Sequence, residues 1–249
     1  QSGLPPFKIY VDKLKTRTDI IQAIKNEELE YQPGTQYVYS DLGMILLAEI
    51  IGDVTGSRID KYMRKEFYFP MGLYSTFFNP TRLGRWMERR IPPTEIDTVY
   101  GRGLVQGRVH DERAYYMDGV AGHAGLFSSA RDMAKFSYLL LNNGMYGGER
   151  YLSKEVIETF TRKQSTLGER GLGFDRKAPF GFTTAGQLAG DDTFGHLGFT
   201  GSSLWIDREK DMAVIILTNR TYPDRSYGKQ ISRIRAEIAD IAYSSVVDQ

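Results

Sequence analysis

Few side chains in this sequence of 249 residues could take part in acid–base or nucleophilic chemistry near neutral pH. There is no cysteine, which excludes a thiol nucleophile, a cysteine-ligated metal and a disulfide framework. The three histidines are His110, His123 and His196, and we expect the first two to be structural residues of polar or glycine-rich loops. No pair of them has the spacing of a metal site, so we expect no metal and no metal catalysis. The Gly-x-Ser-x-Gly elbow and the phosphate-binding glycine loop are also missing from the sequence.

Two short motifs carry the strongest chemical signal. The first is Tyr39-Ser40-Asp41, directly before an apolar run with helical spacing, and the second is His196-Leu197-Gly198, before two strand-like stretches. Taken singly, such a tyrosine can be an ordinary buried aromatic residue and such a histidine a structural one. Because both motifs occur in one chain, we interpret Tyr39 and His196 as residues that face one shared cleft.

The first motif requires a helix to position it. We expect this helix to begin after Ser40, a good N-cap residue, and to end at Gly56. Apolar residues recur through it at intervals of three or four positions, and this apolar side should be core: Leu42, Ile45, Leu46, Ile50 and Val54. Shorter helices are expected over residues 58–66, 130–141 and 154–161, each after a serine.

The second motif requires a sheet. Residues 202–207 and 212–218 are rich in β-branched and apolar side chains, and residues 208–211 between them are typical of a hairpin turn. A last amphipathic stretch over residues 229–246 should pack across the sheet through four isoleucines, Ile231, Ile234, Ile238 and Ile241. The pattern predicts an α+β fold, a helical lobe beside an antiparallel sheet covered by a C-terminal helix.

We expect one domain over residues 1–249, mainly helical to about residue 145, with the hairpin and last helix in residues 146–249. The 32 basic and 31 acidic residues give a formal charge of +1 without a basic stripe, so nucleic acid is not an expected partner. No apolar run is long enough to span a membrane, and Gln1 to Phe7 lacks the layout of a signal peptide. The sequence does not begin with methionine, and we expect it to be incomplete at its N-terminus.

The two motifs resemble the Tyr-x-Asn and Lys/His-x-Gly elements of serine β-lactamases of the class C type, of low-molecular-weight penicillin-binding proteins, and of their esterase and D-aminopeptidase relatives. Three further stretches resemble this family in the same order, so that the resemblance covers nearly the whole chain: residues 1–5, 122–132 and 171–174. The family fold is the β-lactamase and transpeptidase fold. Its nucleophile is the serine of a Ser-x-x-Lys motif.

This resemblance implies acyl transfer without a cofactor, on a small ester, amide or β-lactam-like substrate or a cell-wall peptide. Tyr39 and His196 would be the catalytic residues, with Tyr39 in proton transfer. The backbone N–H of Phe199 would donate to the oxyanion, and Gly198 would let the substrate approach closely. Asp41 would contact the substrate. The resemblance also implies a periplasmic or extracellular location.

Two residues depart from the usual motifs. Asp41 replaces asparagine, so the side chain can accept but not donate a hydrogen bond, and it adds a negative charge that disfavours anionic substrates. His196 replaces lysine and is only partly charged near neutral pH, which weakens its hold on a substrate carboxylate. We therefore expect weak penicillin turnover.

A Ser-x-x-Lys motif does not occur before Tyr39, where the family order requires it. One match, Ser226 to Lys229, lies late in the chain, and we interpret it as a chance occurrence. One hypothesis is therefore a serine hydrolase whose nucleophile segment is missing from this chain, which alone would be inactive. The alternative is a non-catalytic module that binds a cell-wall peptide or sugar and is fused to another domain, such as a glycoside hydrolase. A third is an unrelated structural α+β domain.

Overall fold

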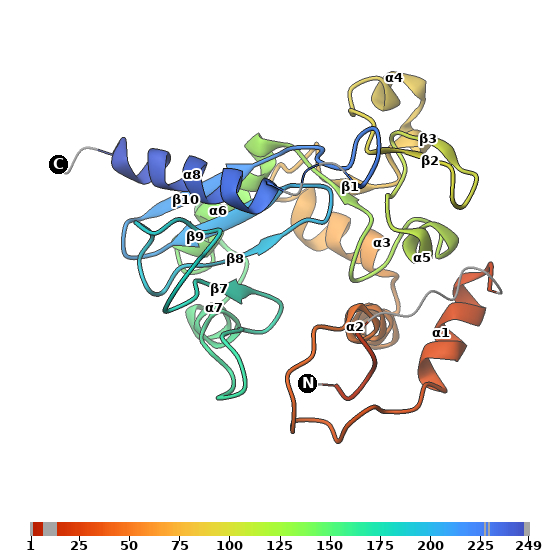
Figure 1. The fold of residues 1–249 in the computed structure, drawn as a ribbon, viewed down its shortest axis with the longest axis horizontal. Helices are drawn as coiled ribbons and strands as arrows, with labels where there is room; N and C mark the ends of the chain where they lie inside the picture. Colours follow the sequence, from red (N-terminus) through yellow and green to blue (C-terminus); the bar gives the residue numbers. More distant parts are fainter. Residues whose placement is uncertain (1, 7–13, 227, 229, 247–249) are drawn as a thin grey trace. The chain divides into compact units, whose positions relative to one another are not determined.

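The computed structural model describes residues 2–6, 14–226, 228 and 230–246 (Figure 1). The chain divides into two compact units, Gln1–Ser128 and Ser129–Gln249, and each is described by itself. Our sequence-based division near residue 145 lies inside the second unit. Within the described part of the chain, no helix combines the length and apolar character needed to cross a membrane.

The first unit is mainly helical. Its longer helices are α1 (Arg17–Lys25) and α2 (Asp41–Thr55), and its short helical segments are α3 (Ile59–Met63), a π-helical turn (Arg64–Tyr68), a 3₁₀ turn (Pro80–Leu83), α4 (Arg85–Glu88) and α5 (Glu112–Tyr116). Two small antiparallel pairs complete it, β1 (Phe77–Phe78) with β4 (Leu126–Phe127) and β2 (Glu95–Asp97) with β3 (Gly103–Val105). The core joins α1, α2 and α5 through Ile20, Ile24, Leu42, Ile45 and Ala114.

Helix α2 begins and ends where the sequence predicts. Ser40 precedes it in an extended conformation, and Gly56 follows it in the left-handed region at φ 66°. The predicted apolar side was too wide, however: Leu42 and Ile45 are fully buried, but Leu46 is only half-buried and Ile50 is 53% exposed. At about 100° per residue, Ile50 lies well away from the line through Leu42 and Ile45 that packs in the core. Val54, on the same side as Ile50, is also exposed.

The second unit is built around a sheet. Its helices are α6 (Ala130–Leu141), α7 (Lys154–Thr161) and α8 (Ile231–Ser244), and its strands are β5 (Met145–Tyr146), β6 (Glu149–Arg150), β7 (Asp175–Arg176), β8 (Phe194–Leu197), β9 (Ser203–Asp207) and β10 (Met212–Ile216). Strands β10, β9, β8 and β7 form one antiparallel sheet in that order, and β5 pairs with β6. The predicted hairpin is β9 and β10, and the α+β fold class is confirmed.

The two faces of this sheet follow the alternation of a strand. Trp205 and Val214, which are opposite each other in the register, pack with Ala239 and Tyr243 of α8. The neighbouring residue Ile206 packs on the other face with Leu140 and Ile157 of α6 and α7, as one cluster with Phe194. Helix α8 therefore covers one face of the sheet, as predicted (Figure 1), and α6 and α7 cover the other.

The side of α8 that faces the sheet differs from the prediction. Its buried residues are Arg235, Ala236, Ala239 and Tyr243, whereas Ile234, Ile238 and Ile241 are exposed and Ile231 is half-buried. The small alanines let the helix approach the strands closely. Arg235 is buried because it hydrogen-bonds to the β8–β9 turn. Of the predicted stretch, Lys229 lies outside the described residues.

Candidate active site

The Tyr39-Ser40-Asp41 motif is held at the start of α2 by the N-terminal segment. The Ser40 hydroxyl donates to the carbonyl of Pro5 at 2.8 Å, and the Asp41 N–H donates to the carbonyl of Pro6 at 3.4 Å. Tyr39 is 47% exposed, so its side chain is accessible rather than part of the core. The motif is therefore fixed through the Ser40 side chain and the Asp41 backbone, with the tyrosine side chain presented at the surface of its unit.

Asp41 forms an ion pair with Arg113 that the sequence did not reveal. Nη2 of Arg113 lies 2.5 Å from Oδ2 of Asp41 and 3.4 Å from Oδ2 of Asp111, and the guanidinium side chain is only 2% exposed. The negative charge of Asp41, which we expected to repel anionic substrates, is therefore partly offset by a buried cation that Asp41 shares with Asp111. Arg113 had no recognisable sequence signal, because its partner is 72 positions away in the chain.

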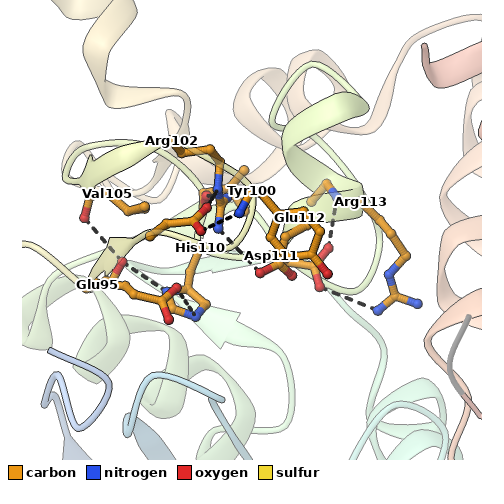
Figure 2. A network of polar contacts seen from close by, with 12 residues as sticks. Glu95, Tyr100, Arg102, Val105, His110, Asp111, Glu112 and Arg113 are labelled. Atoms are coloured by element: carbon orange, nitrogen blue, oxygen red, sulfur yellow. Dashed lines mark hydrogen bonds and ion pairs between the residues drawn. The ribbon is translucent and has the colours of Figure 1, made fainter. Parts of the chain in front are cut away.

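Asp111, which Figure 2 shows beside Arg113, connects this ion pair to His123. Its Oδ1 accepts from Nε2 of His123 at 2.8 Å and from the N–H of Ala114 at 2.8 Å, which caps α5. Burial favours the protonated form of Asp111, but the hydrogen bond from His123, the charges of His123 and Arg113 and the N–H of Ala114 outweigh it and hold the pKa of Asp111 far below its usual value. The carboxylate is thus ionised at neutral pH and orients Arg113 toward Asp41.

A second polar network holds the base of α5 in place (Figure 2). Arg102, at the end of the β2–β3 turn, forms a buried ion pair with Asp97 and lies 3.4 Å from Glu112, the first residue of α5. Burial raises the pKa of Asp97, yet the hydrogen bond from Arg102 and backbone N–H groups lower it more, so that its pKa is below the usual value. His110 is half-buried, with Nδ1 3.1 Å from the Thr94 hydroxyl and Nε2 3.7 Å from Oε2 of Glu95. These contacts fix the helix that carries Arg113.

His196 lies on β8 in the second unit, paired with Leu204 of β9. Its Nδ1 is 2.9 Å from the carbonyl of Leu197. Because a carbonyl can only accept, Nδ1 carries the proton, and in the neutral ring Nε2 then has the lone pair. In its neutral form, His196 can accept a hydrogen bond at Nε2, which the ammonium group of a lysine cannot do.

The turn after His196 contains Gly198 and the N–H of Phe199, the predicted oxyanion donor. The Gly198 N–H donates to the carbonyl of Ser202 at 2.7 Å, which closes the turn. Gly201 has φ 119°, and a Cβ there would lie 2.2 Å from Oγ1 of Thr218, so only glycine fits. A Cβ on Gly198 would meet nothing nearer than Ser202 at 3.4 Å, so packing against this chain does not demand glycine there.

The predicted site residues therefore fall into two local groups. Tyr39 and Asp41 meet at the start of α2, and His196, Gly198 and Phe199 meet at the end of β8. That the two groups share one cleft stays a prediction. Ser226 lies in an exposed turn where its N–H donates to Asp224, and the lysine of its chance motif is outside the described residues. The described side chains include no group of three or more His, Asp or Glu that could hold a metal ion.

An antiparallel sheet with one helix across it, a Tyr-x-Asp motif at a helix start and a His-x-Gly motif at a strand end define the class of serine β-lactamases and penicillin-binding proteins. The sequence profile of the Beta-lactamase family matches residues 1–237. The chain belongs to this family.

Two bacterial relatives of this chain carry a name that is more specific than the family description. The chain is 37% identical over 243 residues to a protein of Escherichia coli O157:H7 named "Putative D-alanyl-D-alanine carboxypeptidase", a match that covers 92% of this chain and 56% of the relative. A protein of Salmonella typhi with the same name is 36% identical over 231 residues, which cover 87% of this chain and 53% of the relative. The chain thus spans about half the length of the curated relatives it matches.

Solved structures show the same fold at low identity. A penicillin-binding protein homologue from Caulobacter crescentus matches 98% of this chain and 68% of its own, with a TM-score of 0.65 and 17% identity. Simvastatin synthase from Aspergillus terreus matches all of this chain and 67% of its own, with a TM-score of 0.68 and 14% identity. A β-lactamase from Mycobacterium bovis has a TM-score of 0.62 at 21% identity, over 87% of this chain and 67% of its own. These likenesses establish the fold.

Proposed function

We propose that this chain is the larger part of a serine acyl-transfer hydrolase that cleaves cell-wall peptides ending in D-alanyl-D-alanine. The observation that carries the proposal is the fixed position of Tyr39 and Asp41 at the start of α2, in a chain of the Beta-lactamase family. The name of the bacterial relatives supports this substrate class. A cell-wall substrate also supports a periplasmic or extracellular location.

Each predicted site residue has a chemical task in this reaction. Tyr39 would transfer the proton of the serine nucleophile, which requires a neighbouring cation because a free phenol has a pKa of about 10. The N–H of Phe199 would stabilise the oxyanion of the tetrahedral intermediate. Neutral His196 would accept a hydrogen bond at Nε2 from the substrate or from the proton-transfer chain.

Asp41 indicates which substrate group it would bind. Its Oδ2 pairs with Arg113, and its carboxylate can only accept hydrogen bonds. Oδ1 would therefore accept from an N–H of the substrate, which a peptide provides and a simple ester does not. Because Arg113 offsets part of the charge, Asp41 repels the terminal carboxylate of a peptide less than an unpaired aspartate would.

We place the nucleophile in a Ser-x-x-Lys segment outside this sequence. The relatives are about twice as long as the part that this chain matches, and the N-terminal segment at Pro5 and Pro6 is hydrogen-bonded to the Tyr-x-Asp motif. A nucleophile segment joined to Pro5 through a short stretch of chain would arrive beside Tyr39.

The test is covalent labelling by an activated ester or a chromogenic β-lactam, followed by mass spectrometry. The 249-residue chain should show no burst, and a longer form that contains Ser-x-x-Lys should be acylated. In that longer form Tyr39→Phe should slow acylation by about 10²- to 10⁴-fold, the range for a positioned proton-transfer group. The control is Tyr37→Phe, at the nearby exposed tyrosine. Stoichiometric labelling of the short chain at Ser226 would show that the nucleophile is internal.

The alternative function is a non-catalytic module that binds a cell-wall peptide or sugar. A longer form that binds D-alanyl-D-alanine but is not labelled by any acylating reagent would support the module and exclude the enzyme.

A further inference from the structure

The β8–β9 turn directs its carbonyl groups at two arginines. Arg235 of α8 donates from Nη2 to the carbonyls of Gly198 and Ser202, both at 2.8 Å, and from Nε to the carbonyl of Gly201 at 3.0 Å. Arg220 takes the two carbonyls in between: its Nε donates to Phe199 at 2.7 Å and its N–H to Thr200 at 2.8 Å. Every carbonyl from Gly198 to Ser202 thus accepts from Arg235 or Arg220.

Arg235 is an unusual residue to find in this position. It is 4% exposed, and within the described ranges it forms no ion pair with a carboxylate. A buried charge is costly unless it is paired or fully hydrogen-bonded, and here neutral carbonyl dipoles take the place of a counter-ion. Burial, with a smaller effect of the Arg220 charge, lowers the pKa of Arg235, but a guanidinium stays protonated in proteins.

The Gly198 carbonyl accepts from Nη2 of Arg235 at 2.8 Å and from the N–H of Gly201 at 3.1 Å, and these two contacts fix the direction of the next N–H group. The peptide between Gly198 and Phe199 is trans, so the Gly198 carbonyl and the Phe199 N–H point in opposite directions. Because the carbonyl points at Nη2 of Arg235, the N–H of Phe199 points away from the guanidinium. A cation at the carbonyl end also polarises the peptide group and makes its N–H a stronger donor.

We propose that Arg235 is the positioning residue for the oxyanion donor: by binding the Gly198 carbonyl it sets the direction and strengthens the donor character of the Phe199 N–H. The catalytic part of this statement rests on the proposed acyl transfer. The geometric part depends only on contacts within the second unit. Arg235 itself does not touch the substrate.

The first test measures the geometry in the 249-residue chain, without turnover. Arg235→Met removes the donors, and Arg233→Met is the matched control, because Arg233 lies two positions earlier on α8 and forms an ion pair with Glu237 at the surface. The readouts are the one-bond N–H dipolar coupling of Phe199 in a weakly aligned sample and amide hydrogen exchange. Arg235→Lys is the second variant if the methionine variant does not fold, because it keeps the cation but not the planar fork.

In Arg235→Met the Phe199 coupling should change, and the amides of Gly198 and Gly201, which are bonded within the turn, should exchange roughly tenfold faster. The coupling and exchange of Leu204, inside β9, should stay as in the parent chain and in Arg233→Met. An unchanged Phe199 coupling in a folded Arg235 variant would overturn the proposal. So would equal changes at Phe199 and Leu204, since Arg235 would then support the whole sheet rather than the turn.

The second test separates positioning from general support of the fold. In the longer form with the nucleophile, Arg235→Met should lower the acylation rate constant by about 10²-fold, as for loss of an oxyanion donor, with KM nearly unchanged. A higher KM with an unchanged rate constant would contradict the role. If that longer form is not acylated even with Arg235 present, the proposed function fails, and the dipolar coupling of Phe199 still decides the role of Arg235.

Discussion

Replacing Arg113 by methionine should destabilise the first unit by about 3 kcal/mol, since breaking a buried ion pair by removing one partner costs about 3 to 5 kcal/mol. Methionine fills much of the same volume but leaves Asp41 and Asp111 without the cation that lies 2.5 and 3.4 Å from them. The two carboxylate side chains are 18% and 21% exposed, so water can partly replace the guanidinium, and we take the lower end of the range.

A double-mutant cycle isolates the pair. Asp41→Asn alone should cost about 1 kcal/mol, because the amide oxygen still accepts from Arg113. The double variant should be no less stable than Arg113→Met, because the carboxylate left without its cation is gone as well. The assay is urea unfolding followed by near-ultraviolet circular dichroism, to which the adjacent rings of Tyr115 and Tyr116 on α5 contribute.

The matched control is Glu66→Gln, which removes an ion pair with Lys65 that is exposed to solvent. It should change the free energy of unfolding by less than about 0.5 kcal/mol. A cost below about 1 kcal/mol for Arg113→Met, or a double variant whose loss equals the sum of the two single losses, would refute the argument from burial.

Three further expectations concern stability. Leu42→Ala should cost about 2 to 5 kcal/mol and Ile50→Ala less than about 1 kcal/mol, because only Leu42 is buried, and a similar loss in urea unfolding for both would contradict the assigned core. Gly201→Ala should lower the thermal midpoint much more than Gly198→Ala, because only Gly201 combines a positive φ with a forbidden Cβ position. The pKa of Asp111 is lower in the folded chain than the value of about 3.9 in an unfolded chain, so ionisation of Asp111 stabilises the fold above about pH 4. This contribution is lost as the pH falls through the folded pKa. Asp111→Asn should therefore make the free energy of unfolding, measured with urea, depend less on pH on the acid side of the profile.

The sequence was informative where local signals determine the structure. Both ends of α2 lie where the sequence predicts, and Gly56 ends the helix in the left-handed conformation that favours glycine. Ser40 precedes the helix in an extended conformation, but its hydroxyl donates to the carbonyl of Pro5 and makes no capping hydrogen bond to α2. Two stretches rich in β-branched and apolar residues predicted the β9–β10 hairpin, whose register involves neighbouring stretches of chain. The motifs placed Tyr39 directly before a helix and His196 before the hairpin, and the structure has both there, but strand β8, which carries His196, was not predicted.

Local sequence signals did not predict which residues pack together over long distances in the chain. Periodicity identifies a helix, but which side is buried depends on what packs against it, and so Ile50 and Ile234 were assigned to the wrong side. Arg113 and Arg235 were missed for a related reason. Their partners are 72 and 37 positions away, and arginine in a helix usually indicates a solvated face.

The different partners of the two buried arginines imply that acid affects the two units unequally. Arg113 is bound by carboxylates, which become neutral when protonated, so its surroundings lose their electrostatic attraction as the pH falls. Arg235 is bound by peptide carbonyls, which have no proton to gain in this range. As the solution is acidified, the start of α2 should therefore loosen first, while the turn that carries Phe199 keeps its shape.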